Sequence, residues 1–497
     1  MGIVIRQSFW GTLITYGGVA IGFISTLLVM PAFLDVEEIG LIRLIQSNAL
    51  MIVPVALLGL NGSFIKYYPN FKNDIKLRNQ IITMNLVLIG AFCFLATFIV
   101  AFSKDWLSTL FVENSPRYIQ YLNITLFIFI AQSFFDYFHS FLWTQGNVIF
   151  QNFIQEILLR VVSLSLIVAF GLSVITFDWL IKLLALNYAG ALFLLLVYAF
   201  LKYKIKLDFN FKAIPKEQFH LLLRFGIYTL SMTVGASILN NVSYAMTSSL
   251  LGLNQNGILT MAAFIATIIE MPKRVVTQII SPIISQDFKD QNALSIKANY
   301  QKASINLGVI GGLLAIGIIT NLDDLFLIIP RGNEFAAGKV LIILFCLSRI
   351  LNMFFGIASE VISYSGFYIK SIYIMLFGSL VMISMNLILI PHLGIAGVGV
   401  AFLCTTIVSQ ILRLGIIYRE LRILPFVKKH WLLIILLGLL FLGFNYLPLN
   451  FHPIWNIALR SVLTTLVFGF LVYLLNVSLE VNAIIDLILQ KIKKVWT

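Results

Sequence analysis

The chain has 497 residues, of which 60% are apolar and 11% are charged, with a net charge of +13 and a mean hydropathy of +0.97. A typical soluble domain is about 45–50% apolar and about 25% charged, so this composition excludes an ordinary soluble enzyme, a disordered chain and a DNA-binding protein. A membrane-spanning helix needs about 20 apolar residues, so the chain has enough for about fourteen such helices and little else.

Fourteen apolar runs follow one another along the chain. Because they are long and continuous, they predict membrane-spanning helices rather than the short, alternating strands of a barrel. The sequence therefore predicts an all-α polytopic membrane protein. Its fourteen spans are expected at residues 8–33, 42–65, 80–103, 118–142, 156–176, 179–201, 224–248, 257–282, 301–320, 338–361, 370–390, 395–417, 431–447 and 456–476.

Lysine and arginine are distributed unevenly between the loops. If the N-terminus is inside, twenty-four of the 34 cations lie on the inner side, six on the outer side and four within spans. Cytoplasmic loops of membrane proteins carry such an excess of Lys and Arg, so both termini are predicted to be cytoplasmic. The net charge is then an orientation signal, and no nucleic-acid partner is expected.

The sequence shows no motif for catalysis. Cys93, Cys346 and Cys404 each lie singly in an apolar run, where they fit small core residues and have no metal-ligand spacing. A Walker loop, a zinc motif and a nucleophile elbow are all absent from the sequence. We therefore expect a protein that is not an enzyme and has no catalytic residue, metal or cofactor.

Paired glycines indicate an internal repeat of segments one to six as segments seven to twelve. A shift of 217 residues pairs Gly40 with Gly257 and the Phe-Lys dipeptide 71–72 with 288–289. An even number of spans per copy makes the two copies parallel, related by an axis along the membrane normal. The predicted domains are a six-helix lobe, a second six-helix lobe, and two additional helices with a basic cytoplasmic tail, at residues 1–220, 221–425 and 426–497.

This layout of six, six and two spans resembles the multidrug/oligosaccharidyl-lipid/polysaccharide (MOP) exporter superfamily, and within it the polysaccharide-biosynthesis (Wzx-type) flippases. The short outer turn at residues 33–41 (FLDVEEIGL) is similar to the superfamily's Leu-Gly-x-x-x-x-Gly turn, and it recurs at residues 251–257 (LGLNQNG). The end of the second span, residues 59–63 (GLNGS), carries the resemblance further.

The resemblance implies a flippase that moves an undecaprenyl-pyrophosphate-linked oligosaccharide from the inner to the outer leaflet by alternating access. It implies a role in assembling a surface polysaccharide, such as O-antigen, capsule or exopolysaccharide, in the bacterial cytoplasmic (inner) membrane. The implied partners are the lipid-linked oligosaccharide, membrane lipids and other polysaccharide-assembly proteins. A proton or sodium gradient is the implied source of energy.

Three alternatives stay open. A lipid II (peptidoglycan precursor) flippase of the same superfamily shares the Glu-x-Pro of residues 270–272, but it has an arginine in place of Thr267 and further arginines in the first span, which is uncharged here. A drug/cation antiporter of the superfamily often has an acid in that span and usually has twelve spans. A membrane-embedded glycosyltransferase or polymerase would need a large outer loop, whereas the longest outer loops here are residues 104–117 and 321–337.

Charged residues within spans are costly and point to functional sites. Glu270, Lys273 and Arg274 share one helical face if the helix continues through Pro272. Lys273 and Arg274 are candidates for binding the pyrophosphate, with Glu270 tuning them; alternatively, Glu270 pairs with Arg274 while Lys273 reaches the cytoplasmic surface. Arg349, about 16 Å deep in its span, either binds substrate or hydrogen-bonds to neighbouring backbone.

Two other sets of polar residues lie within predicted spans. Asp136 and His139 follow Gln132 on one face of the fourth span, where they either couple transport to protons or ions or form an interfacial pair. Asn240 and Asn241 lie in the seventh span, where they either contact sugar or pack helices together.

Overall fold

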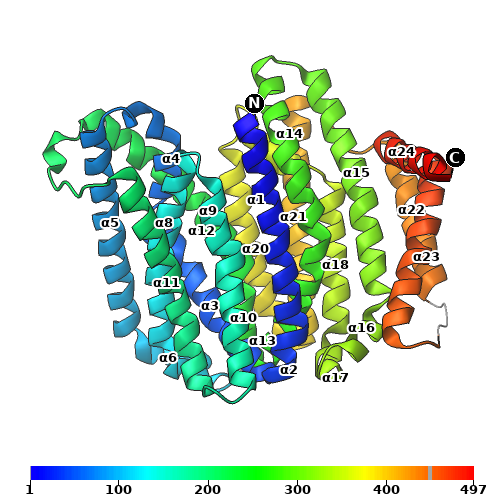
Figure 1. Cartoon of the computed structure of the whole chain (residues 1–497), viewed down its shortest axis with the longest axis horizontal. Helices are drawn as coiled ribbons and strands as arrows, with labels where there is room; N and C mark the ends of the chain where they lie inside the picture. Colours follow the sequence, from blue (N-terminus) through cyan, green and yellow to red (C-terminus); the bar gives the residue numbers. More distant parts are fainter. Residues whose placement is uncertain (1, 446–449, 497) are drawn as a thin grey trace. The chain divides into compact units, whose positions relative to one another are not determined.

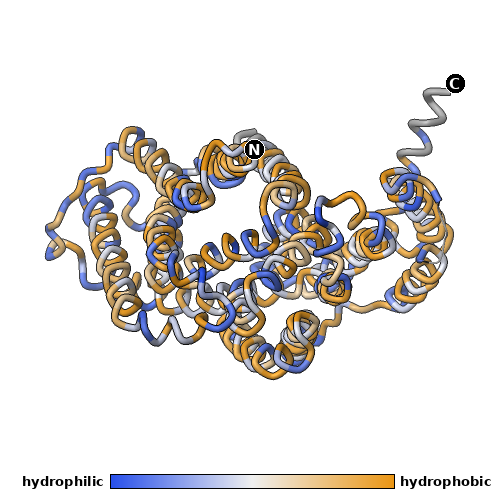
Figure 2. The backbone as a smooth tube through the Cα atoms, turned by 90° about the horizontal axis from the view of Figure 1, so that it is seen from below, coloured by the Kyte–Doolittle hydropathy of each residue, from blue (hydrophilic) through white to orange (hydrophobic). Residues whose placement is uncertain are grey.

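The computed structural model describes residues 2–445 and 450–496, and these residues form helices and connecting turns without any strand. Thirteen of the helices in these ranges are long and apolar enough to cross a membrane, and apolar residues colour most of the helical tube in Figure 2. The chain is therefore an all-α polytopic membrane protein, as predicted. Residues 446–447, at the end of the span predicted at 431–447, lie outside the described residues.

The thirteen membrane-crossing helices correspond to thirteen of the fourteen predicted spans. They are Leu13–Phe33, Val36–Leu57, Ile75–Phe102, Leu122–Thr144, Ile149–Gly171, Phe177–Tyr203, Lys216–Leu251, Ala293–Ile319, Gly332–Phe354, Lys370–Leu393, Ile395–Leu421, Lys428–Asn445 and Pro453–Leu474.

The region predicted as the eighth span, residues 257–282, is broken in the structure. Helix α13 (Leu253–Thr267) ends in a 3-10 turn at Ile268–Glu270, and α14 (Met271–Lys289) begins after it. Pro272 stands in the first turn of α14, where its missing N–H is tolerated, whereas inside a continuous helix it would remove a hydrogen bond. The interruption places Glu270 and Lys273 at the start of a new helix.

The chain forms two compact units, Met1–Thr260 (unit 1) and Met261–Thr497 (unit 2), and most of their helices are labelled in Figure 1. Unit 1 includes the first part of α13, as far as Thr260. Its other helices are α1 (Gly2–Phe23), α2 (Met30–Phe33), α3 (Val36–Leu57), α4 (Leu60–Phe71), α5 (Ile75–Phe102), α6 (Lys104–Phe111), α7 (Pro116–Gln120), α8 (Leu122–Thr144), α9 (Val148–Asn152), α10 (Leu159–Gly171), α11 (Phe177–Tyr203) and α12 (Lys216–Leu251).

Two glycines allow α3 and α13 to cross closely within unit 1. A Cβ on Gly40 would lie 1.9 Å from the Leu253 carbonyl oxygen, and a Cβ on Gly257 would lie 2.0 Å from the Val36 carbonyl oxygen. The Asn256 amide donates to the Gly40 carbonyl at 2.8 Å across the same crossing. The two glycines that the 217-residue shift pairs therefore pack against each other's helix.

Unit 2 contains the rest of α13 and the helices that carry most of the charged residues predicted within spans. Its other helices are α14, α15 (Ala293–Ile319), α16 (Leu322–Ile328), α17 (Gly332–Phe335), α18 (Lys339–Phe354), α19 (Ala358–Tyr364), α20 (Lys370–Leu393), α21 (Ile395–Leu421), α22 (Lys428–Asn445), α23 (Pro453–Leu474) and α24 (Leu479–Trp496).

Helix α15 lies in the middle of the packing in unit 2. One apolar cluster joins it to α14, α19, α20 and α21 through buried residues such as Ile284, Val361 and Ile417. A second cluster joins it to α22 and α23 through residues such as Leu433 and Phe468. The two last predicted spans are thus packed on the same helix that borders the charged region.

Candidate functional site

Polar residues spaced three positions apart on three helical segments converge in unit 2. The spacing matters because residues at i and i+3 lie on one face of a helix. Each pair is contributed by a different part of the chain, namely Glu270 and Lys273 (the start of α14), Arg349 and Asn352 (α18), and Gln410 and Arg413 (α21).

Glu270 is held through both of its carboxylate oxygens. Oε2 accepts a hydrogen bond from Arg349 Nη1 at 2.6 Å, and Oε1 accepts one from the Asn352 amide. The two side chains of the ion pair are only 20% and 22% exposed, and the Arg349 guanidinium also lies 4.9 Å from the centre of the Phe402 ring. The positive charge of Arg349 is therefore matched directly by a partly buried carboxylate.

Lys273 is bound by an amide instead of a carboxylate. Its Nζ donates to the Asn352 backbone oxygen at 3.2 Å and to the Asn352 side-chain oxygen at 3.0 Å. That side-chain oxygen also accepts a hydrogen bond from Gln410 Nε2 at 2.7 Å. Lys273 is half-buried, and no carboxylate oxygen lies within 4 Å of its ammonium group among the described residues.

A second carboxylate, Glu360 on α19, lies near Lys273. Its Oε1 accepts a hydrogen bond from the Thr277 hydroxyl at 3.3 Å, whereas its buried Oε2 has no hydrogen-bond partner in the described part of the chain. Glu360 is close enough to Lys273 and to Arg413 for Coulomb interactions, and Tyr300 on α15 is close to Arg413 and Glu360. We define the charged cluster as Glu270, Lys273, Tyr300, Arg349, Asn352, Glu360, Gln410 and Arg413.

The charged cluster has an excess of positive charge. Lys273, Arg349 and Arg413 contribute three cations, and Glu270 and Glu360 contribute two carboxylates. A partly buried group of charges with a net positive sign attracts an anion, because the surrounding low dielectric weakens the screening of the excess charge. In the described part of the chain, no group of three or more His, Cys, Asp or Glu side chains could hold a metal ion.

Arg274 lies apart from the charged cluster. Its side chain is exposed, and the partner of Glu270 is Arg349 on another helix. The i,i+4 pair between Glu270 and Arg274, which the sequence left open, is not formed. The break before Met271 explains this, because Glu270 belongs to a 3-10 turn and α14 begins only after it.

Asn240 and Asn241, predicted either to contact sugar or to pack helices together, lie on α12 in unit 1. The Asn240 amide donates to the Ala236 carbonyl at 2.9 Å, and the Asn241 amide donates to the Ser237 carbonyl at 3.0 Å. Asn240 is exposed and Asn241 is buried. The Asn241 amide also donates to the Ser237 hydroxyl at 3.4 Å, so both amides are hydrogen-bonded within their own helix.

Asp136 and His139 lie on α8 in unit 1. The Gln132 amide donates to Asp136 Oδ1 at 2.7 Å, which is the contact expected for residues at i and i+4. His139 is half-buried with its Nε2 unpartnered, and its ring packs near Phe135. The stripe predicted on the fourth span is therefore present on one helix.

Sequence reasoning missed several members of the charged cluster. Gln410 and Arg413 have the same i,i+3 spacing as Arg349 and Asn352 and lie in an equally apolar run, so this spacing was a usable signal. Arg413 is one of the twenty-four cations predicted on the inner side. Arg43 is one of the six predicted on the outer side, but it lies within α3, where its guanidinium covers the Tyr244 ring at 4.2 Å.

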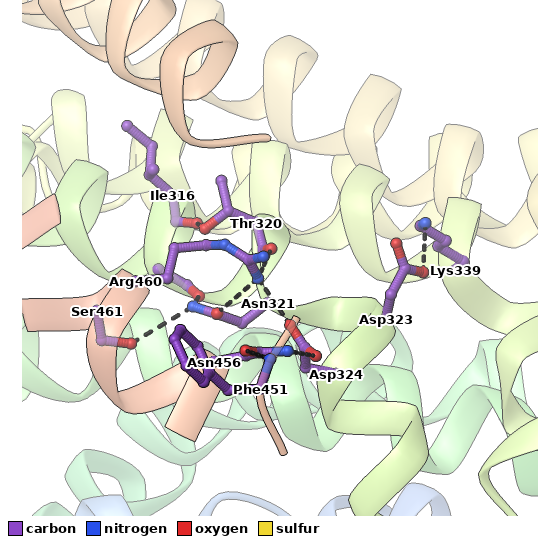
Figure 3. A network of polar contacts seen from close by, with 11 residues as sticks. Ile316, Thr320, Asn321, Asp323, Asp324, Lys339, Phe451, Asn456, Arg460 and Ser461 are labelled. Carbon is purple, nitrogen blue, oxygen red and sulfur yellow. Dashed lines mark hydrogen bonds and ion pairs between the residues drawn. The ribbon is translucent and has the colours of Figure 1, made fainter. Parts of the chain in front are cut away.

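A separate polar network in unit 2 fastens α23 to α16 (Figure 3). Arg460 Nη1 donates to Asp324 Oδ2 at 2.8 Å, to Asn321 Oδ1 at 3.1 Å and to the Thr320 carbonyl at 2.9 Å. Asn456 Nδ2 donates to the other Asp324 oxygen at 2.9 Å. Both Asp324 oxygens are thus occupied, and the network links helices that are far apart in sequence.

No protein-family model matches the chain, and no curated protein matches it at a significant level. Several solved structures do match. The lipid II flippase MurJ, in an inward closed conformation, matches with a TM-score of 0.70 over 93% of this chain and 98% of that chain, at 15% identity.

Two multidrug transporters extend the comparison. An inward-facing MATE family transporter of the MOP superfamily matches with a TM-score of 0.63 over 83% of this chain and 94% of that chain, at 14% identity. The Vibrio cholerae MATE transporter VcmN matches with a TM-score of 0.54 over 84% of this chain and 97% of that chain, at 10% identity. The chain therefore has the fold of the MOP exporter superfamily.

Proposed function

We propose that the chain is a flippase that moves undecaprenyl-pyrophosphate-linked oligosaccharide units from the inner to the outer leaflet. The observation that carries the proposal is the charged cluster, in which three cations and two carboxylates lie within one helical unit. The cations would bind the pyrophosphate, and the resemblance to Wzx-type flippases supports a surface polysaccharide as the final product.

The physical requirement for such a protein is clear. A pyrophosphate and its sugars cannot cross about 30 Å of hydrocarbon unaided, because their charged and hydroxyl groups would lose their hydrogen bonds. Cations on membrane-spanning helices offset that cost for the phosphates, and arginine does so with two parallel hydrogen bonds. The lipid tail stays in the bilayer throughout.

Lipid II flipping is the second candidate. Its specific support is the match to MurJ at a TM-score of 0.70 and the Glu-x-Pro sequence at residues 270–272. Thr267 and the uncharged first span depart from the lipid II flippase pattern. A drug/cation antiporter is the third candidate, supported by the MATE fold match.

The proposal includes a cell-biological setting. The protein would lie in the bacterial cytoplasmic (inner) membrane with both termini in the cytoplasm, and it would act beside other polysaccharide-assembly proteins without being an enzyme. A proton or sodium gradient would drive the cycle. Asp136 and His139 are the candidates for the coupling site.

Reconstitution tests the proposal directly. Proteoliposomes would contain the purified full-length protein and a fluorescent undecaprenyl-pyrophosphate oligosaccharide or fluorescent lipid II, and a membrane-impermeant quencher would report which leaflet holds the lipid. We expect movement of the oligosaccharide lipid, and loss of this movement in Lys273→Ala and Arg349→Ala but not in Arg419→Ala, which removes an exposed cation. Movement of lipid II alone would favour the second candidate, and movement of neither lipid would refute both flippase proposals.

A further inference from the structure

The two carboxylates of the charged cluster are held very differently. Both oxygens of Glu270 accept hydrogen bonds, one of them from Arg349. Glu360 has a single hydrogen bond of 3.3 Å to a hydroxyl, and its second, buried oxygen has none. Arg349 is consequently neutralised by direct contact, whereas the cations near Glu360 are not.

Arg413 is the cation of the charged cluster with its hydrogen-bonding capacity free. Its guanidinium makes no hydrogen bond and no ion pair within 4 Å to any described residue, although Glu360 is close enough for a Coulomb interaction. A guanidinium has five N–H donors in a fixed fork that matches phosphate oxygens. Arg413 therefore has its whole donor fork available, whereas Arg349 directs Nη1 to the carboxylate of Glu270.

A buried hydroxyl lies near the same guanidinium. The Tyr300 side chain is 0% exposed, and its hydroxyl has no hydrogen-bond partner among the described residues, while Arg413 is close enough to it for a Coulomb interaction. Buried polar groups are nearly always hydrogen-bonded, so an unpartnered hydroxyl within electrostatic range of an unpartnered guanidinium indicates that a ligand or water completes the site. Both groups can donate to an acceptor oxygen, and the positive charge of Arg413 favours an oxyanion as the ligand.

Lys273 connects this region to Arg349. Its ammonium interacts electrostatically with Glu360 and Arg413 and also with Glu270 and Arg349. Only amide and carbonyl oxygens of Asn352 hold it. An anion that binds beside Arg413 thus remains within reach of a second cation as it moves toward Arg349.

We propose that Arg413, Lys273 and Tyr300 form the first binding position for a phosphate-type oxyanion, and that Arg349 forms the second. The second position opens only when the anion replaces Glu270 as the partner of Arg349. This inference rests on the proposed flippase function and adds the order in which the cations engage the pyrophosphate. Glu270 acts as an internal counter-anion that keeps Arg349 occupied until the ligand arrives.

Binding and flipping measured on the same variants test this order. Undecaprenyl pyrophosphate would be titrated into the full-length protein in detergent micelles, and the oligosaccharide-lipid assay would follow in proteoliposomes. We expect Arg413→Ala to weaken binding at least tenfold, whereas Arg349→Ala changes binding less than threefold but abolishes flipping. Glu270→Gln should bind several-fold more tightly, because it frees Arg349.

Milder variants guard against misfolding. Tyr300→Phe removes only the hydroxyl and should weaken binding about threefold, and Arg413→Lys keeps the charge but not the fork and should fall between wild type and Arg413→Ala. Arg419→Ala, six positions further along α21, is the matched control and should bind like wild type. Normal elution and thermal unfolding of each variant establish that it is folded.

The outcomes separate this inference from the function on which it rests. Wild-type flipping with unchanged binding in Arg413→Ala and Tyr300→Phe would overturn the first position and leave the flippase proposal standing. Loss of binding in Arg349→Ala as great as in Arg413→Ala would overturn the order. A wild-type protein that neither binds nor flips the lipid would refute the proposed function itself.

Discussion

Asn352 holds the charged cluster of unit 2 together with a single amide group. Its NH₂ donates to Glu270, and its oxygen accepts from Lys273 at 3.0 Å and from Gln410 at 2.7 Å. The amide therefore stands between a carboxylate and an ammonium group that could otherwise pair with each other. As a result, Glu270 pairs with Arg349, and Lys273 has no direct carboxylate partner among the described residues.

Replacing Arg349 alone should destabilise the protein more than replacing Arg349 and Glu270 together. Arg349→Ala leaves a carboxylate that is only 20% exposed without its cation, and losing one partner of such a pair costs about 2 kcal/mol. The double variant Arg349→Ala/Glu270→Gln removes the stranded charge as well. Thermal unfolding of the purified proteins in detergent measures which of the two variants is less stable.

An exposed ion pair provides the control for this comparison. Lys339 and Asp323 form a contact of 2.6 Å, but their side chains are 44% and 80% exposed. Such a pair contributes about 0–1 kcal/mol, so Lys339→Ala should leave the unfolding temperature nearly unchanged. A double variant that is less stable than Arg349→Ala would contradict the interpretation of Glu270 as a carboxylate that needs its cation.

The sequence was informative about which residues share a helical face but not about which faces meet. Helical spacing alone puts Glu270 on one face with Lys273 and Arg349 on one face with Asn352, because such neighbours depend only on local geometry. The contact between Arg349 and Glu270 joins residues 79 positions apart. A single sequence does not show which residues so far apart are in contact. Arg274 was therefore as reasonable a partner for Glu270 as Arg349 until the break before Met271 was known.

Secondary-structure elements were more predictable, and the two glycines at the crossing of α3 and α13 show why. Long apolar runs predict spanning helices reliably, because backbone groups in hydrocarbon can hydrogen-bond only to each other. Gly40 and Gly257 were visible as a pair at a shift of 217 residues, but their mutual contact was not. The crossing depends on backbone approach, and only the absence of a side chain permits it.

Adding a methyl group at this crossing should destabilise the protein. Gly257→Ala would place a Cβ 2.0 Å from the Val36 carbonyl oxygen, so one of the two backbones must shift, at a cost of about 2 kcal/mol. Gly190→Ala is the matched control in the same unit, because a Cβ there meets nothing within 4 Å and alanine favours a helix more than glycine does. Equal unfolding temperatures for both variants would show that the crossing is not a stable contact.

At the scale of the whole chain, the number of membrane crossings decides on which side the C-terminus lies. The described residues contain thirteen helices that qualify as spans by themselves, an odd number that would put the termini on opposite sides. The broken segment α13–α14 changes this parity if it also crosses. Residues 253–289 supply roughly 55 Å of helix at about 1.5 Å per residue, which exceeds the roughly 30 Å of hydrocarbon.

We therefore expect fourteen crossings, with the loop after α14 on the cytoplasmic side. The exposed cations Lys289 and Lys297 on either side of that loop support this orientation. Single cysteines at Lys212 and Gln291 should react with an impermeant maleimide only in inside-out vesicles, whereas cysteines at Glu113 and Asn333 should react in intact cells. All four positions are exposed, and Cys93, Cys346 and Cys404 would first be replaced by serine. Because Gln291 follows the broken segment directly, its labelling in intact cells would show that α13–α14 does not cross and that every later loop lies on the opposite side.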